Sequence, residues 1–160
     1  MRALVQRVKA SWVVVDGKEV GRIEKGLNIL LGVRVGDTKE KVDKLVEKVV
    51  HLRIFEDERG KFQYSLLDVK GSALVVSQFT LYANTQKGRR PSFEEAERPE
   101  RAKELYELFV KKLSQYVPVQ TGIFGAHMGG FHNKRRTRNH PFGGLKLNLQ
   151  EHTKGYYQTT

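Results

Sequence analysis

The sequence predicts a single α+β domain with a mostly antiparallel, barrel-like β-sheet and two helices. Short β-rich runs recur about seven or eight times along the 160 residues, whereas two segments have helical periodicity. The two helices do not alternate strictly with the strands, which favours α+β over a doubly wound parallel sheet. A chain of this length fits one domain.

The first four strands are predicted from alternation, β-branched runs and turn residues. Residues 2–8 alternate between apolar and polar side chains, as in a strand with one solvated face. The runs 12–15 and 20–23 flank the pair Asp-Gly at 16–17, which tolerates the positive φ angles of a two-residue hairpin. Residues 26–33 form a nearly continuous apolar run and are expected to be a buried strand.

Two helices are expected between the later strands. Residues 38–51 repeat apolar side chains at helical spacing, with Asp37 as the expected N-cap and Glu40 completing a capping box. The second helix is expected to begin at Pro99, a favourable first-turn residue, and to be stopped by Pro118. Further short strands are expected at 53–56, 62–67 and 119–128.

The stretch 72–82 is predicted to be a buried strand with an unusual polar end. Its apolar run is followed by Ser77, Gln78 and Thr80. An unpaired polar group in a buried strand costs about 1–3 kcal/mol, so these groups are either paired within the sheet or face a ligand at its edge. The following loop, residues 84–91, carries three positive charges, so this edge is a candidate site for an anionic ligand.

The composition excludes several classes of protein. The chain has no cysteine, which excludes disulfides and a cysteine nucleophile and makes a cytoplasmic location the default. The histidines lack a ligand spacing supported by acidic residues, so neither a metal nor another cofactor is expected. No segment approaches the roughly 20 apolar residues of a membrane span. The net charge of +11 favours nucleic acid or another polyanion as a partner, and the alternative is a cationic surface that serves only solubility.

The Ser-Gln-Phe-Thr motif at 77–80 resembles the signature of the D-aminoacyl-tRNA deacylases. The opening strand is similar to that family, and so are the segments 26–33, 53–55, 90–93 and 119–122, in the same order. The resemblance extends over residues 1–128. It implies hydrolysis of the ester that joins a D-amino acid, or glycine mischarged on tRNA-Ala, to the 3′ end of tRNA, which serves chiral proofreading. It also implies a homodimer that binds aminoacylated tRNA, and neither DNA nor a membrane.

The same resemblance assigns roles to residues of the motif. Phe79 would offer its backbone N–H, and Thr80 its hydroxyl and N–H, to the reacting ester, so these two are the candidate catalytic residues. Ser77 and Gln78 would hold the 3′-adenosine and the amino acid, with Arg7 nearby. The sequence leaves open whether the Thr80 hydroxyl, the backbone N–H groups or the 2′-OH of the tRNA carries the catalysis.

Two basic segments have alternative interpretations. Lys87, Arg89 and Arg90 would lie near tRNA phosphates, and the alternative is a solvated basic loop. Residues 129–160 carry a net charge of +5. If this loop and tail bind RNA without a reaction, the protein is a non-catalytic basic RNA-binding module, which is the main alternative to the enzyme.

Residues 129–160 depart from the family, which has a Gly-Pro-containing segment near its C-terminus that excludes L-amino acids. This chain contains no Gly-Pro. Synonymous codons can be chosen for 129–144 so that removal of one base gives Asn-Asp-Gly-Pro-Val-Thr, with Gly-Pro at the positions of Arg136 and Thr137. The interpretation is a deacylase domain over 1–128, incomplete at its C-terminal strand, followed by an anomalous, out-of-frame basic tail. The alternative is a genuine RNA-binding extension.

Overall fold

The computed structural model describes residues 1–125 with their side chains and the backbone of 131–133, 146–150 and 156–158. The main sheet has six strands in the order β11-β10-β1-β4-β7-β8. Its strands are β1 (Arg2–Val8), β4 (Gly26–Gly32), β7 (Ser72–Ser77), β8 (Val119–Thr121), β10 (Lys146–Gln150) and β11 (Tyr156–Gln158). A second sheet contains β3 (Lys18–Ile23), β2 (Ser11–Val15) and β9 (Phe131–Asn133), and a small one pairs β5 (Phe55–Glu56) with β6 (Phe62–Tyr64).

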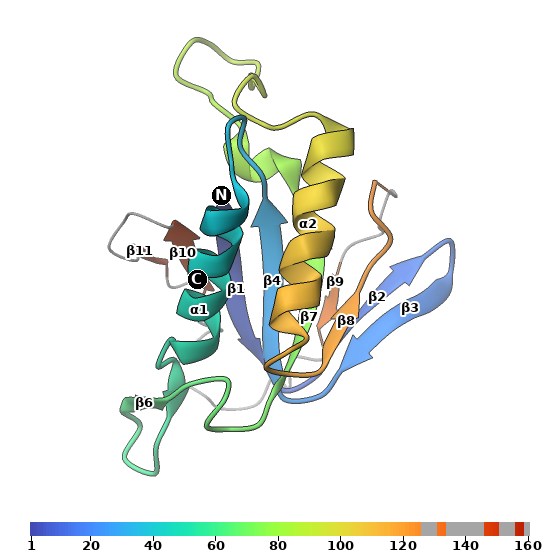
Figure 1. Ribbon diagram of the computed structural model, residues 1–160. Coiled ribbons are helices and arrows are strands. Elements are labelled where there is room, and N and C mark those ends of the chain that lie inside the picture. Colours follow the sequence, from blue (N-terminus) through green and yellow to red (C-terminus); the bar gives the residue numbers. More distant parts are fainter. Residues whose placement is uncertain (126–130, 134–145, 151–155, 159–160) are drawn as a thin grey trace.

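The predicted α+β class is confirmed, whereas the barrel-like description is not. Most strand pairs are antiparallel, but β7 runs parallel to both β4 and β8, so the main sheet is mixed. The pairings among the described residues do not close a barrel. The parallel pairs matter for the site, because β4 and β7 end at the same edge of the sheet (Figure 1).

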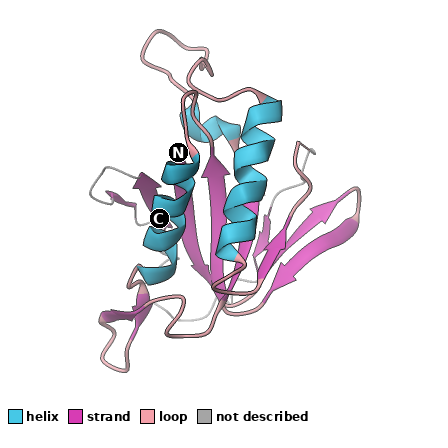
Figure 2. Ribbon diagram, viewed as in Figure 1, coloured by secondary structure: helices cyan, strands magenta, loops and turns pink. Residues whose placement is uncertain are grey.

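The helices α1 (Lys39–His51) and α2 (Pro99–Leu113) lie side by side on one face of the main sheet (Figures 1 and 2). Apolar side chains of β1 and β4 alternate toward this face and pack with the buried stripes of the two helices into the main core. The opposite face packs against the β2–β3 hairpin through a smaller cluster: Val13, Val15, Ile23, Leu74 and Val76. Among the described residues, no helix is long and apolar enough to cross a membrane.

The predicted capping box at the start of α1 is wrong. The N-cap is Thr38, one residue later than expected. The Asp37 carboxylate instead binds the N-terminal ammonium of Met1 at 2.9 Å, with both groups buried, and accepts a hydrogen bond from the Arg34 N–H at 2.7 Å. A buried carboxylate is best stabilised by a charged partner and further donors, so Asp37 connects the chain start to the β4–α1 loop rather than capping the helix.

Several other boundaries differ from the predictions. The helix α2 begins at Pro99 as predicted, but ends at Leu113, well before Pro118. The strand β6 is shorter than 62–67 because Ser65 and Asp68 form a turn, in which the Ser65 N–H donates to the Asp68 carboxylate at 2.8 Å. The strand β8 ends at Thr121, and 126–128 of its predicted range lie outside the described residues.

The tail also differs, because no strand was predicted within 129–144 or 155–160. The structure has β9 in the first segment and β11 in the second. Both are three-residue strands that pair with an existing strand edge. Backbone groups at an edge can pair without a helpful side-chain pattern, so alternation did not reveal these strands.

Candidate functional site

The predicted site stretch is a strand followed by a short 3₁₀ helix. The strand β7 ends at Ser77, opposite Leu31 of β4, and the Gln78 N–H donates to the Leu31 carbonyl at 2.8 Å. The chain then turns into η1 (Phe79–Tyr82). The change to a compact turn explains the polar end of the apolar strand, because residues 77–80 leave the core at the carboxyl edge of β4 and β7 (Figure 1).

Gly32 lets η1 pack closely against the end of β4. A Cβ atom at this position would lie 3.0 Å from the Leu81 Cβ and 3.2 Å from both the Gln78 carbonyl oxygen and the Tyr82 ring. These distances are tighter than ordinary van der Waals contacts, so a side chain here would push η1 away from the sheet. The glycine therefore fixes the position of the predicted catalytic segment.

Arg2 holds the other end of η1. Its Nη1 donates to the Leu81 carbonyl at 2.7 Å, and its guanidinium lies 4.5 Å from the centroid of the Tyr82 ring. A planar guanidinium can make both contacts at once, because its donors point outward in the plane while its face stacks on the ring. Arg2 thus ties the first strand to the segment that follows β7.

The predicted catalytic residues lie at the surface. Phe79 is 58% exposed and Thr80 is also exposed. The Gln78 side-chain amide donates a hydrogen bond to the Thr80 hydroxyl. The backbone N–H groups of Phe79 and Thr80 make no hydrogen bond within the described part of the chain. The segment therefore presents a hydroxyl, an amide and two backbone donors to an incoming ligand.

The basic loop, residues 84–92, lies next to η1. Two hydrogen bonds of 2.8 Å, between the backbones of Asn84 and Ser92, close the loop at its base. The closure places Phe93 against Phe79, with ring centroids 5.2 Å apart in an edge-to-face arrangement. The rim of the site is therefore aromatic.

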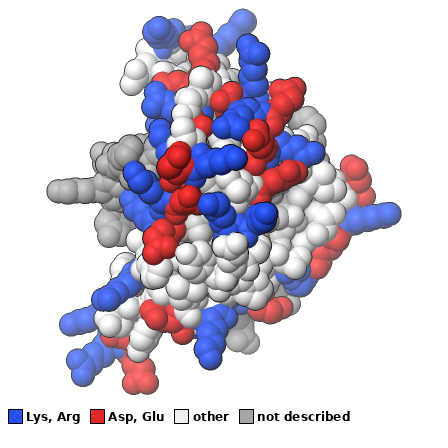
Figure 3. Space-filling view, viewed as in Figure 1, with Lys and Arg blue, Asp and Glu red and all other residues white. Residues whose placement is uncertain are grey.

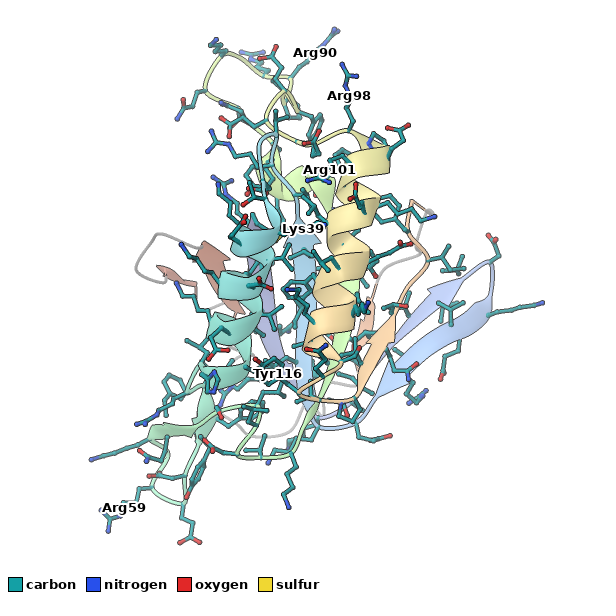
Figure 4. The ribbon with its side chains drawn as sticks, in the orientation of Figure 1. Lys39, Arg59, Arg90, Arg98, Arg101 and Tyr116 are labelled. Atoms are coloured by element: carbon teal, nitrogen blue, oxygen red, sulfur yellow. The ribbon has the colours of Figure 1, made fainter. Side chains whose placement is uncertain are left out.

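The charges of the basic loop face solvent. Lys87, Arg89 and Arg90 are exposed, and none of them forms an ion pair with another described residue. In Figure 4, Arg90 lies at the end of the molecule where the helices begin. Figure 3 shows that acidic side chains are interspersed with the basic ones there, so this end is not uniformly positive.

Within one chain, Arg7 does not join the other predicted site residues. Its partner in the β1–β4 register is Leu27, whereas Ser77 aligns with Leu31, four residues along β4. At about 3.3 Å per residue, that offset is about 13 Å along the sheet. Arg7 instead binds the Glu56 carboxylate at 3.2 Å.

Sequence reasoning missed three residues that shape the site: Arg2, Gly32 and Phe93. Phe93 stood in a segment matched to the family, but nothing in the motif indicated that its ring touches Phe79. Arg2 and Gly32 contact η1 where it packs against the ends of β1 and β4. A tertiary contact of this kind leaves no periodic pattern in the sequence.

Two other features of the molecule lie apart from this candidate site. A groove of about 390 Å³ lies between α2 and residues 121–124, and none of the predicted site residues lines it. Tyr106 borders this groove, and burial raises the pKa of its phenol to about 12. Its hydroxyl donates to the Val75 carbonyl at 2.9 Å, so it is a structural group. The described residues contain no cluster of three or more metal-ligating side chains.

The comparisons with known proteins define the class. The family model described as D-Tyr-tRNA(Tyr) deacylase matches residues 4–130. The chain belongs to this family. A protein named D-aminoacyl-tRNA deacylase from Aquifex aeolicus is 70% identical over 132 residues, which cover 82% of this chain and 89% of that protein. A protein of the same name from Persephonella marina is 63% identical over 131 residues, which again cover 82% and 89%.

Solved structures agree with the fold. The structure titled "c-Myc DNA Unwinding Element Binding Protein" superposes with a TM-score of 0.81 at 35% identity, covering 94% of this chain and 98% of that one. A probable eukaryotic D-amino acid tRNA deacylase superposes with a TM-score of 0.73 at 18% identity, covering 84% and 94%, and supports the fold alone.

Proposed function

We propose that this protein is a D-aminoacyl-tRNA deacylase: it hydrolyses the ester between a D-amino acid and the 3′ end of tRNA and releases both. The observation that carries the proposal is the 70% identity over 132 residues with a relative of that name. The exposed donors at residues 78–80 suit this chemistry. Because the substrate is aminoacylated tRNA, the protein would act in the cytoplasm.

The reaction needs little from side chains. An aminoacyl ester is already activated, so a positioned water and a stabilised oxyanion suffice. The N–H groups of Phe79 and Thr80 are the available donors for the oxyanion, and Ser77 and Gln78 lie beside them for the adenosine and the amino acid. The chemistry requires no cofactor. Activity lost to a chelator and restored by one divalent ion would contradict this.

Replacement of Thr80 separates the candidate catalysts. We expect Thr80→Ala to lower kcat by at least about 10-fold, because it removes a polar group that touches the reacting ester. Wild-type turnover in this variant would exclude the hydroxyl as nucleophile and leave the backbone N–H groups and the tRNA 2′-OH as the catalysts. Single-turnover hydrolysis of D-Tyr-tRNA measures the chemical step directly.

The remaining roles need a second copy of the chain or a larger part of the tRNA. Arg7 lies about 13 Å along the sheet from Ser77, so it would contribute to substrate binding through a homodimer whose subunits bring the two ends together. The basic loop would contact phosphates. Glycyl-tRNA would also be a substrate, because glycine lacks the side chain by which enantiomers are distinguished.

We further propose that residues 129–160 are read out of frame after a domain formed by 1–128. The family match ends at residue 130, close to the predicted break. Sequencing the gene across the Met128 codon tests this proposal. One intact frame encoding the present tail would contradict it and favour a genuine basic extension.

The main alternative is a non-catalytic RNA-binding module, and one relative's title adds DNA as a ligand to exclude. Incubation with D-Tyr-tRNA and L-Tyr-tRNA separates these functions, using both the present chain and the frame-restored version. Release of D-tyrosine alone supports the enzyme. Salt-sensitive binding of tRNA without release in either version supports the module, and preferential binding of single-stranded DNA supports the second ligand.

A further inference from the structure

The two phenylalanines beside the basic loop have no evident structural purpose. Phe79 is 58% and Phe93 38% exposed, yet the loop closure holds their rings in contact. Single exposed apolar side chains are common on protein surfaces, whereas contiguous ones mark interaction sites, and these two rings are contiguous. Phe79 and Phe93 together are called the aromatic platform below.

The surroundings of the platform suit a polyanion. Lys87, Arg89 and Arg90 project from the adjacent loop without an ion pair to another described residue. Two of the neighbouring acids are already engaged: Glu95 binds the Arg34 guanidinium at 3.4 Å, and Glu97 accepts from the Arg98 N–H at 2.9 Å. The loop cations are therefore available to phosphates.

Exposed rings next to free cations are the usual components of a single-strand nucleic-acid site. Bases stack on aromatic faces, and the cations follow the backbone. We propose that the aromatic platform and the basic loop bind the unpaired nucleotides that precede the terminal adenosine of the tRNA. This inference rests on the proposed function, because it extends the same site by the nucleotides next to the reacting ester.

The geometry supports this order of nucleotides. Phe79 and Thr80 are consecutive, so their Cα atoms lie about 3.8 Å apart. The Phe79 ring is therefore adjacent to the backbone N–H groups that are the proposed oxyanion donors. The loop lies beyond the ring, on the side of Phe93. If the terminal adenosine lies at Ser77 and Gln78, the nucleotide before it would lie on the aromatic platform. The nucleotides further from the 3′ end would lie at the loop cations.

Phe93→Leu tests the platform without altering the catalytic backbone, because leucine is apolar but has no aromatic face. The matched control is Tyr116→Leu, a similarly exposed aromatic (44%) that follows α2 and that Figure 4 shows far from Arg90. Each protein is assayed on D-Tyr-tRNA and on D-tyrosyl-adenosine, which ends before the platform. We expect KM for D-Tyr-tRNA to rise about 10-fold in Phe93→Leu alone, with kcat and the adenosine substrate unchanged.

Binding of the trinucleotide 5′-CCA-3′ gives a readout that does not need activity. We expect Phe93→Leu to weaken it about 10-fold and to leave adenosine binding unchanged. Equal losses for both ligands, or no loss, would overturn the inference. If neither the present chain nor the frame-restored version hydrolyses either ester, the proposed function fails, while the trinucleotide measurement still decides on the platform.

The loop cations are tested by salt dependence. Arg90→Gln should reduce the slope of log Kd against log salt by about 0.7, the value for one phosphate contact with a single strand. Arg59→Gln is the control, since Figure 4 places Arg59 at the other end of the molecule. An unchanged slope in Arg90→Gln would contradict the phosphate contact. A shift of Phe93→Leu from dimer to monomer in sedimentation would instead assign the rings to a second copy of the chain.

Discussion

The two ends of the main sheet use the same pair of residue types for different purposes. At one end Arg2 lies 4.5 Å from the Tyr82 ring, and at the other Arg7 lies 5.3 Å from the Phe62 ring. The difference lies in the second partner of each guanidinium. Arg2 donates to a backbone carbonyl of η1, whereas Arg7 binds a partly exposed carboxylate. The same arginine–aromatic contact therefore holds the predicted site segment at one end and an exposed ion pair at the other.

The ion pairs of the two ends differ in the same way. The Met1 ammonium and the Asp37 carboxylate are fully buried next to the end of β4, where η1 packs. The Arg7–Glu56 pair retains 20% and 33% of its side-chain exposure. Burial makes the first pair sensitive to loss of one partner, and solvent screening makes the second one weak. The end of the sheet next to η1 therefore depends more strongly on its ion pair for stability than the Arg7 end does.

The largest expected effect is on the buried pair. We expect Asp37→Asn to lower the free energy of unfolding by about 3–5 kcal/mol, because it leaves the Met1 ammonium buried without a counter-charge. Urea denaturation followed by circular dichroism measures the loss. A loss below 1 kcal/mol would mean that the two ends do not differ in stability.

Gly32→Ala should lower the free energy of unfolding less than Asp37→Asn does, and its main effect should be on kcat. The added methyl must displace η1, since it would lie 3.0 Å from the Leu81 Cβ. Overpacking of this kind costs about 1–3 kcal/mol, and the displacement moves Phe79 and Thr80 from their positions. We expect kcat for D-Tyr-tRNA to fall at least about 10-fold, since small misplacements of catalytic groups are expensive.

Gly36→Ala provides the contrast, because space is open around that glycine. Its φ of +87° disfavours alanine, so it should lose stability without a matching loss in kcat. Equal kcat in the wild type and Gly32→Ala would show that the position of η1 does not control the reaction.

The helices and strands were predictable where a local sequence pattern determines them. The strands at 2–8 and 26–33, the hairpin and both helices follow from alternation, turn residues and helical spacing, and the structure confirms them within a few residues. The capping residue was not predictable in this way. Asp37 has the right side chain for a cap, but a distant ammonium competes for it, and no local pattern reveals that partner.

The sequence motif of the candidate site was predictable, but the arrangement of its residues in space was predicted only in part. Residues 77–80 were located by resemblance, and the structure places them together with the basic loop at one sheet edge. Whether they carry the predicted roles stays a prediction. Arg7 was expected nearby because it belongs to a matched strand, but position along a strand depends on register, which the sequence leaves undefined until pairing is known.

Tyr106→Phe tests the packing of α2 behind the site strand. At neutral pH we expect a loss of about 1 kcal/mol, because the hydrogen bond to the Val75 carbonyl is removed. Burial raises the pKa of Tyr106 to about 12, against about 10 in the unfolded chain. The neutral phenol therefore contributes full stability below pH 10, and this contribution is lost as the pH rises toward 12.

The comparison across pH isolates this one group. The wild type should lose stability relative to Tyr106→Phe between pH 10 and pH 12, so that the difference between the two proteins shrinks. Chemical denaturation at each pH measures it. A difference that stays constant over this range would mean that Tyr106 is equally ionisable in the folded and unfolded chains.

The smallest expected effect is at the Arg7 end. Glu56→Gln should lower the free energy of unfolding by less than about 1 kcal/mol, and the loss should shrink further at high salt, as for other exposed pairs. It should leave KM for D-Tyr-tRNA within twofold of the wild type if Arg7 acts only within its own chain. A KM change of 10-fold or more would bring this end into the substrate site. Because Arg7 lies four residues of register from Ser77 within one chain, the contact would then have to come from the partner subunit.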